Sequence, residues 1–405
     1  MGNENQEMPE NYSEVVDADD KKSLVFNEKA TEGQTGNLPS ASCNFINSIT
    51  GSGIIGLPYS MRQAGFPLGT LLLFLVAYIT DYSVILLIKG GNLSGTNTYQ
   101  SLMNRAFGMA GYVILSFLQF LYPFIAMVSC NIISGDTLTK VFQRIPGVGP
   151  ESILAERHLV IMLTTILLVL PLSLCRNIVN FGKVSFSSLV LTIAILVIVV
   201  IRVVTLGPHI PSTDNAWNFA QPNAIQAIGV MTFGYTQGDL FENYCKDDNL
   251  ITAGRFLYAI TIIFTFPIEC FVTREVIANL FFGGTLSTIF HVVVTVCIIA
   301  AVTGIALAFD CLGIVLELNG VVAAIPLVFI IPTACYLKLS EESWYHWDSI
   351  QSFMILITGI LVMIVGFVMV IMFPQGCSHG KEMFYCMPSN SSIYNLTGSV
   401  NETVS

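Results

Sequence analysis

A cluster of helix-breaking residues lies inside the first hydrophobic segment, in the stretch NSITGSGIIGLPYS from Asn47 to Ser60. The breakers are Gly51, Ser52, Gly53, Gly56 and Pro58. A lipid-facing helix has no use for such a cluster, because unpaired backbone groups in hydrocarbon cost several kcal/mol each. Broken backbone at membrane depth is tolerated where it lines a cavity, so the stretch predicts a site for a solute or an ion.

The break offers an anion site and a cation site side by side. The N–H groups from about Ile54 onward direct the positive end of a half-helix at the gap, where the carboxylate of an amino acid fits. Carbonyl oxygens of Ile49 and Thr50 and the side-chain oxygen of Asn47 suit Na⁺, which prefers oxygen ligands. We therefore expect the substrate to contact Gly51, Ser52, Gly53 and Ile54. The alternative is close helix packing through small residues.

Two further polar residues lie within apolar segments. Thr265 precedes Pro267 in AITIIFTFPIEC, which places a hydroxyl beside a freed carbonyl and suggests a second Na⁺ ligand. The alternative is a threonine that bonds back to its own helix. Glu317 in LGIVLELNG is the most deeply apolar of the ionisable residues, and proton coupling is one role for an acid at membrane depth.

Composition identifies the molecule that holds these residues. The chain has 405 residues, 53% hydrophobic and 11% charged, with a mean hydropathy of +0.70. These values predict an all-α polytopic membrane protein, since soluble domains carry about a quarter charged residues. The net charge of −10 comes largely from the N-terminal tail and argues against nucleic-acid binding. No HExxH motif or P-loop is present, so we predict neither an enzyme nor a bound cofactor.

Nine stretches are long enough to span a bilayer, which takes about 20 apolar residues. They are 41–61, 67–90, 111–135, 158–175, 185–206, 251–273, 286–308, 312–336 and 350–373. A tenth run, 224–235, is only about a dozen residues long and predicts a re-entrant piece. The chain thus divides into a disordered acidic tail (1–40), a transmembrane domain (41–373) and a polar tail (374–405).

The polar tail indicates the orientation. It holds three glycosylation sequons in quick succession, at Asn390, Asn395 and Asn401, which predict a lumenal or extracellular location unless they occur by chance. Nine crossings from a cytoplasmic N-terminus give the same result. In that oxidising location we expect a disulfide between Cys377 and Cys386.

The motif NSITGSGIIGLPY resembles the first-helix signature of the amino acid/auxin permease family, and PYSMRQAGFPLG, TYQSLMNRAFG and TQGDLFENYC support the resemblance over about residues 40–390. It implies a fold like the leucine transporter, with two inverted five-helix repeats, an extra helix, and broken helices one and six. It also implies small neutral amino acids as substrates, Na⁺ as the usual coupling ion, and counter-moved protons in some members. Asn47 and Thr265 match the expected Na⁺ positions, and Gly51, Ser52 and Gly53 match the substrate-facing break.

The chain departs from the family pattern between Phe233 and Gly234. Family members have eleven helices, and two crossings are expected where this sequence passes directly from VMTF to GYTQGDLFENY. We therefore interpret the chain as a shortened form in which run 224–235 is the outer half of helix six. Two functions follow: an amino acid transporter of the plasma membrane or an endomembrane, or a transport-inactive protein that senses amino acids or binds partners. A receptor or channel of another class is a third alternative.

Overall fold

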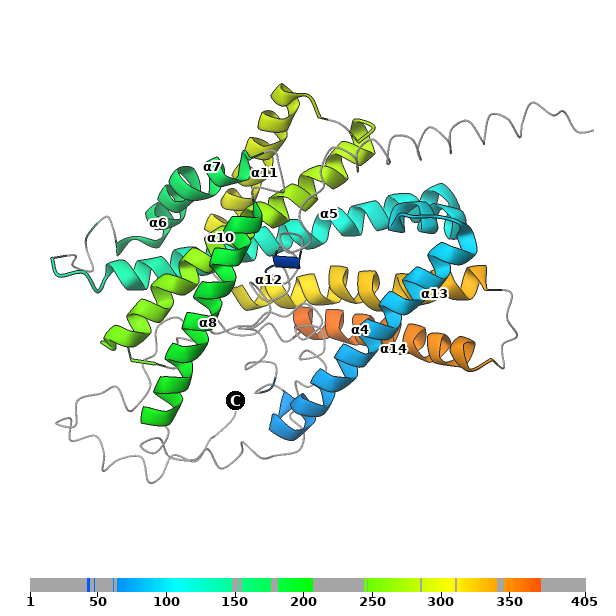
Figure 1. Cartoon of the computed structure of the whole chain (residues 1–405), viewed down its shortest axis with the longest axis horizontal. Coiled ribbons are helices and arrows are strands. Elements are labelled where there is room, and N and C mark those ends of the chain that lie inside the picture. The colour runs from blue at the N-terminus through cyan, green and yellow to red at the C-terminus, as the bar shows by residue number, and fades with distance from the viewer. Residues whose placement is uncertain are drawn as a thin grey trace, which may run out of the picture.

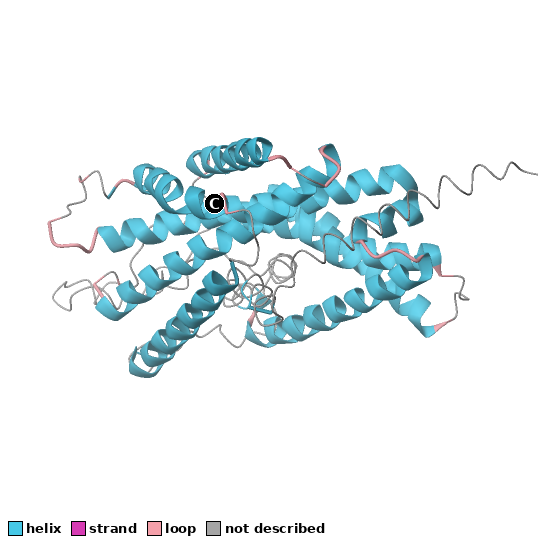
Figure 2. Cartoon of the chain, turned by 45° about the horizontal axis from the view of Figure 1, so that its top comes forward, coloured by secondary structure: helices cyan, strands magenta, loops and turns pink. Residues whose placement is uncertain are grey.

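The computed structural model describes most of residues 64–372 and the isolated residues 42, 43, 47 and 61. The gaps within 64–372 are 148–151, 153–154, 176–180, 207–243, 246, 285, 310–311 and 341–345. The described part is helical and contains no strand (Figure 2). Seven of its helices are long and apolar enough to cross a membrane, and the apolar helix Arg157–Ser173 is shorter. The chain is therefore an integral membrane protein.

Ten α-helices are described along the chain. They are α4 (Phe66–Ser94), α5 (Tyr99–Phe142), α6 (Arg157–Thr164), α7 (Leu170–Ser173), α8 (Phe181–Leu206), α10 (Asn249–Phe281), α11 (Thr288–Ala308), α12 (Leu312–Asn319), α13 (Ile331–Leu339) and α14 (Trp347–Met372). Three π-helical turns interrupt them: η2 (Thr165–Val169) between α6 and α7, and η5 (Gly320–Ala324) and η6 (Pro326–Ile330) between α12 and α13. Eight of the nine predicted spans coincide with these helices, and the first predicted span and run 224–235 lie mostly or wholly outside the described residues.

The span predicted at 111–135 lies within α5, which begins earlier, at Tyr99, and contains a kink at Gly108. The hydroxyl of Thr98 accepts a hydrogen bond from the Ser101 N–H and caps the helix, as threonine does at N-termini. The first turns carry polar residues, so they do not register as an apolar run. Gly108, with φ of 68°, then bends the chain before the apolar part of α5 begins.

Helix α5 is the centre of the larger helix group, where α10 packs along it and α6, α11 and α12 pack around it (Figure 1). The core between these helices includes the fully buried side chains of Met127, Ile132, Ile262 and Phe266. The closest approach is at Gly135, where an added Cβ would lie 2.2 Å from Cγ1 of Ile161. Any side chain at 135 would force α6 away, since packed interiors leave no spare volume.

A smaller group contains α4, α13 and α14, which pack with the π turns of the α12–α13 segment (Figure 1). Phe329 and Val321 lie buried between α4 and α14. Lys89 and Asp348 connect the end of α4 to the start of α14 through an ion pair of 2.6 Å. The two groups share α5 and the α12–α13 segment, so they form one helical body.

Candidate functional site

Asn47 is the described residue of the predicted first-helix site. Its side chain is fully buried, and neither its amide nitrogen nor its amide oxygen has a hydrogen-bond partner. A buried amide without partners costs about 1–3 kcal/mol, so such groups in proteins usually meet water, an ion or a ligand. The other predicted residues of this site, Ile49, Thr50, Gly51, Ser52, Gly53 and Ile54, lie outside the described residues.

Thr265 occupies the middle of α10 and is fully buried. Its hydroxyl donates a hydrogen bond of 3.0 Å to the carbonyl of Thr261, one turn earlier. This is the contact expected of a threonine that bonds back to its own helix, the alternative given above, and it leaves the lone pairs of the hydroxyl oxygen free to accept or to coordinate. No hydrogen bond joins Thr265 to Asn47, so the two predicted Na⁺ ligands remain separate observations.

Buried amides line the contacts of α5 with α11 and α12. The Asn131 Nδ2 group donates to the Thr303 hydroxyl at 3.2 Å, and the Asn319 Nδ2 group donates to the Tyr122 carbonyl at 3.2 Å. The Oδ1 atom of Asn319 is buried without a partner. Sequence reasoning missed these residues, although an asparagine inside an apolar run is a visible signal.

Two acids lie among these helices. Glu317 in α12 is 3% exposed, and both of its carboxyl oxygens are buried without a hydrogen-bond partner. Glu269 in α10 is 8% exposed and close enough to the Tyr122 phenol to interact electrostatically. The structure thus confirms that Glu317 is deeply buried, as its apolar flanks predict.

A buried cation holds the opposite end of α10. The Arg274 guanidinium donates to the Ser173 carbonyl at 3.1 Å and to the Thr295 hydroxyl at 3.0 Å. His291 contacts the Leu174 carbonyl at 3.2 Å through Nε2. The two carbonyls belong to the C-terminal end of α7, where the negative end of the helix dipole favours a cation. This cluster is therefore structural.

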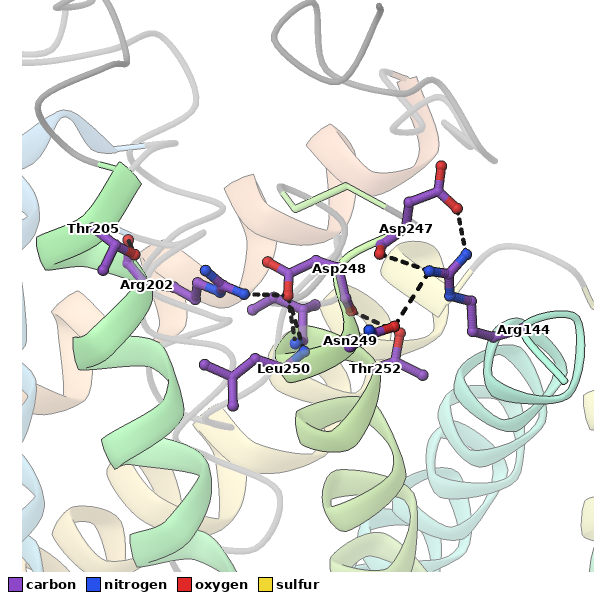
Figure 3. A network of polar contacts seen from close by, with 9 residues as sticks. Arg144, Arg202, Thr205, Asp247, Asp248, Asn249, Leu250 and Thr252 are labelled. Carbon is purple, nitrogen blue, oxygen red and sulfur yellow. Dashed lines mark hydrogen bonds and ion pairs between the residues drawn. The ribbon is translucent and has the colours of Figure 1, made fainter.

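At the start of α10 an ion-pair network ties three helices together (Figure 3). Arg144 from the end of α5 contacts the Asp247 carboxylate at 2.6 Å, the Asp247 carbonyl at 2.9 Å and the Asn249 side chain at 3.2 Å. Arg202 of α8 contacts the Asp248 carboxylate at 2.5 Å. The same carboxylate accepts from the N–H groups of Leu250 and Ile251, so it caps α10 while pairing with α8.

Tyr244 and Cys245 lie just before this network. Burial raises the pKa of the Tyr244 phenol, nearby Arg202 lowers it and Asp248 raises it, so the phenol stays neutral at physiological pH. Cys245 is disulfide-bonded, and the other described cysteines are free. The predicted pair Cys377–Cys386 and the sequons at Asn390, Asn395 and Asn401 also lie outside the described residues.

Comparison with known proteins identifies the family. The model of the transmembrane amino acid transporter protein family matches residues 34–238 and 228–372, in two segments that meet where the sequence predicts missing helices. The chain is 57% identical to the Bos taurus protein named "Putative sodium-coupled neutral amino acid transporter 11", over 94% of this chain and 92% of that one. It is 24% identical to the Saccharomyces cerevisiae "Vacuolar amino acid transporter 2", over 88% of each chain.

The alignment with the bovine relative spans 429 positions, 24 more than the 405 residues of this chain. Because 94% of this chain is about 381 residues, about 48 of those positions have no residue here. With the family model covering most of the sequence and a relative more than half identical, the chain belongs to the transmembrane amino acid transporter protein family.

Proposed function

We propose that the chain is a secondary-active transporter of small neutral amino acids, coupled to Na⁺ and, in a counter-moving step, to protons. The amino acid carboxylate would bind at the break formed by Gly51, Ser52, Gly53 and Ile54. Na⁺ would be held by oxygens of Asn47, Ile49, Thr50 and Thr265. The family assignment and the relatives' names support amino acid transport as the general activity.

The observation that carries the proposal is the buried amide of Asn47. It lies four residues before the Gly-Ser-Gly break, is fully shielded, and has no partner for either polar atom. Packing alone would favour an apolar residue there, since an unpaired amide destabilises the fold. An oxygen that accepts no hydrogen bond is available to a cation, and Thr265 offers a second buried oxygen on α10.

Sodium binding tests this role without requiring transport. A ligand that binds only the folded state stabilises it by RT ln(1 + [L]/Kd), so we expect Na⁺ to raise the melting temperature of the purified chain relative to choline. Asn47→Ala should abolish that rise. Asn131→Ala is the matched control, because it removes another buried amide that is already paired with Thr303. A sodium response of equal size in Asn47→Ala and the parent would refute the assignment.

The direction of insertion rests on two independent features. The tail sequons at Asn390, Asn395 and Asn401 predict an extracellular or lumenal C-terminus. Disulfide-bonded Cys245 predicts that the start of α10 faces the same oxidising compartment. We infer a cytoplasmic N-terminus and a location in the plasma membrane or an endomembrane. Treating cells with a peptide N-glycosidase should shift the mobility of the chain, and substitution of all three asparagines by glutamine should remove that shift.

A second function is favoured by the shortened middle of the chain. About 48 positions of the bovine relative have no counterpart here, which is close to two spans of about 20 residues. The two segments of the family match overlap at 228–238, beside the predicted junction of Phe233 and Gly234. Loss of helix six removes the other wall of the amino acid site, so the chain would act as a sensor or partner-binding protein that does not transport.

Reconstituted flux separates the two functions. Na⁺-dependent uptake of a radiolabelled neutral amino acid into liposomes by the purified chain supports transport. No uptake, with uptake restored in a chimera that carries the bovine segment between residues 233 and 234, supports the inactive form. No uptake by the purified chain or by the chimera would refute amino acid transport as the activity of the chain.

A further inference from the structure

Among the described residues, Glu317 is the acid whose two carboxyl oxygens are both buried without a partner. Its side chain is 3% exposed and lies in α12, which packs against α5 and α14. No described charged group interacts with it, and burial alone defines its electrostatic environment. Glu317 is therefore isolated from every described counter-ion.

An ionised carboxylate is unfavourable in such a place. Desolvation of an unpaired carboxylate costs far more than desolvation of the neutral acid, which needs only modest hydrogen bonding. Asp136 and Asp348, by contrast, each pair with a basic side chain, Arg157 and Lys89 respectively. The absence of such a partner at Glu317 favours a bound proton over a free negative charge.

A metal ion would need several oxygens directed at one point. Asn319 lies two positions after Glu317, and residues two apart on a helix face different sides. The described residues contain no group of three acidic, histidine or cysteine side chains that could hold a metal. The ligand that fits a single isolated carboxyl is a proton.

The titratable groups on neighbouring helices do not replace a counter-ion. Helix α5 brings Tyr122, whose carbonyl is occupied by Asn319 and whose phenol interacts with Glu269 of α10. Asp348 of α14 lies at the first turn of that helix and is paired with Lys89. These groups are neutral, acidic or already paired, so none of them compensates a charge on Glu317.

Two π-helical turns, η5 and η6, begin three residues after this acid, at Gly320. Such wide turns are rare and often occur at functional sites. A π turn contains one residue more than an α turn. If one π turn becomes an α turn, the helix on one side of it therefore rotates relative to the other side by about one residue, which is about 100° in an α-helix. The rotation would turn α12 against α13 and move Glu317 away from its apolar surroundings.

We infer that Glu317 is a proton-binding site within the membrane, which holds its proton in the described conformation and exchanges it when α12 rotates on the π turns. This inference deepens the proton coupling of the proposed function by assigning it to one side chain. Its test below does not depend on transport, so a chain that fails to move amino acids leaves it intact.

Infrared spectroscopy reports the protonation state directly. The full chain is purified in nanodiscs at a mildly alkaline pH, where exposed carboxyls are ionised. The spectrum of the parent minus that of Glu317→Gln should contain the carbonyl stretch of a protonated carboxylic acid. Glu269→Gln is the matched control and should retain the Glu317 band. If the spectrum of the parent minus that of Glu317→Gln contained carboxylate bands and no carbonyl stretch of a protonated acid, the inference would be overturned.

Deuterium exchange tests release of the proton. Transfer into D₂O should shift the Glu317 band as the proton exchanges, whereas an acid that is permanently enclosed would show no shift and would overturn the exchange step. If Glu317→Gln fails to fold, Glu317→Asp serves instead. It should displace the band in frequency, and an unchanged band would mean that another acid produces it.

Discussion

Asp248 gives the sharpest test of how the start of α10 is held, because one carboxylate performs two roles. It caps α10 through the N–H groups of Leu250 and Ile251, at 2.9 and 3.3 Å. It also accepts a charged hydrogen bond from Arg202 of α8 at 2.5 Å (Figure 3). Loss of a cap costs about 1 kcal/mol, and loss of a hydrogen bond to a charged group costs about 1.5–3 kcal/mol. The Arg202 and Asp248 side chains are 25% and 13% exposed, so the lower part of that range applies.

We therefore expect Asp248→Ala to lower the free energy of unfolding by about 2–3 kcal/mol. Asp248→Asn keeps an N-cap oxygen and loses only the charge, so its loss should be about half as large. The assay is thermal unfolding in detergent, with Arg202→Met and the double variant completing a cycle that isolates the pair. Equal losses for Asp248→Ala and Asp248→Asn would show that the cap contributes nothing, and additive single losses would refute the ion pair.

Three further outcomes follow from contacts elsewhere. Gly135→Ala should destabilise the chain by about 1–3 kcal/mol, because its Cβ would overlap Ile161, whereas Gly304→Ala, which meets open space inside α11, should not lower the melting temperature. Arg274→Met should cost about 2–4 kcal/mol in a denaturant titration, since it removes the charge-assisted contacts with Ser173 of α7 and Thr295 of α11. Lys89→Met should cost less than about 1 kcal/mol and the cost should shrink in high salt, because this ion pair is half-exposed.

Hydropathy predicted the helices well because the bilayer imposes one length on every span. It placed the spans at 67–90, 251–273 and 350–373 within a few residues of α4, the inner part of α10, and α14. It did not predict the polar turns from Tyr99 to the kink at Gly108, which precede the apolar run. Helix ends depend on caps and long-range contacts, which an average of hydropathy over a window does not contain.

The candidate site was predictable only in part. The burial of Glu317 follows from its apolar neighbours in sequence, and the burial of Thr265 follows from its place in the middle of an apolar span. The π turns after Glu317 leave no comparable signal, because they change the hydrogen-bond register and not the composition. The contact of Arg274 with Ser173 joins residues 101 positions apart, so it depends on packing that local patterns do not specify.

The shortening that we propose between Phe233 and Gly234 should affect the two proposed ligands differently. Thr265 is positioned by α10, and α10 is held at its start by Arg144 and Arg202 and at its other end by Arg274, all described residues outside the shortened region. Asn47 belongs to the first segment, which is also retained. The proposed Na⁺ ligands would therefore not require the helices that we propose are missing, whereas an amino acid at the proposed Gly51–Gly53 site would lose its second wall. A chain that gains thermal stability from Na⁺ but not from any neutral amino acid would show this separation, and equal stabilisation by both ligands would mean that another segment completes the amino acid site.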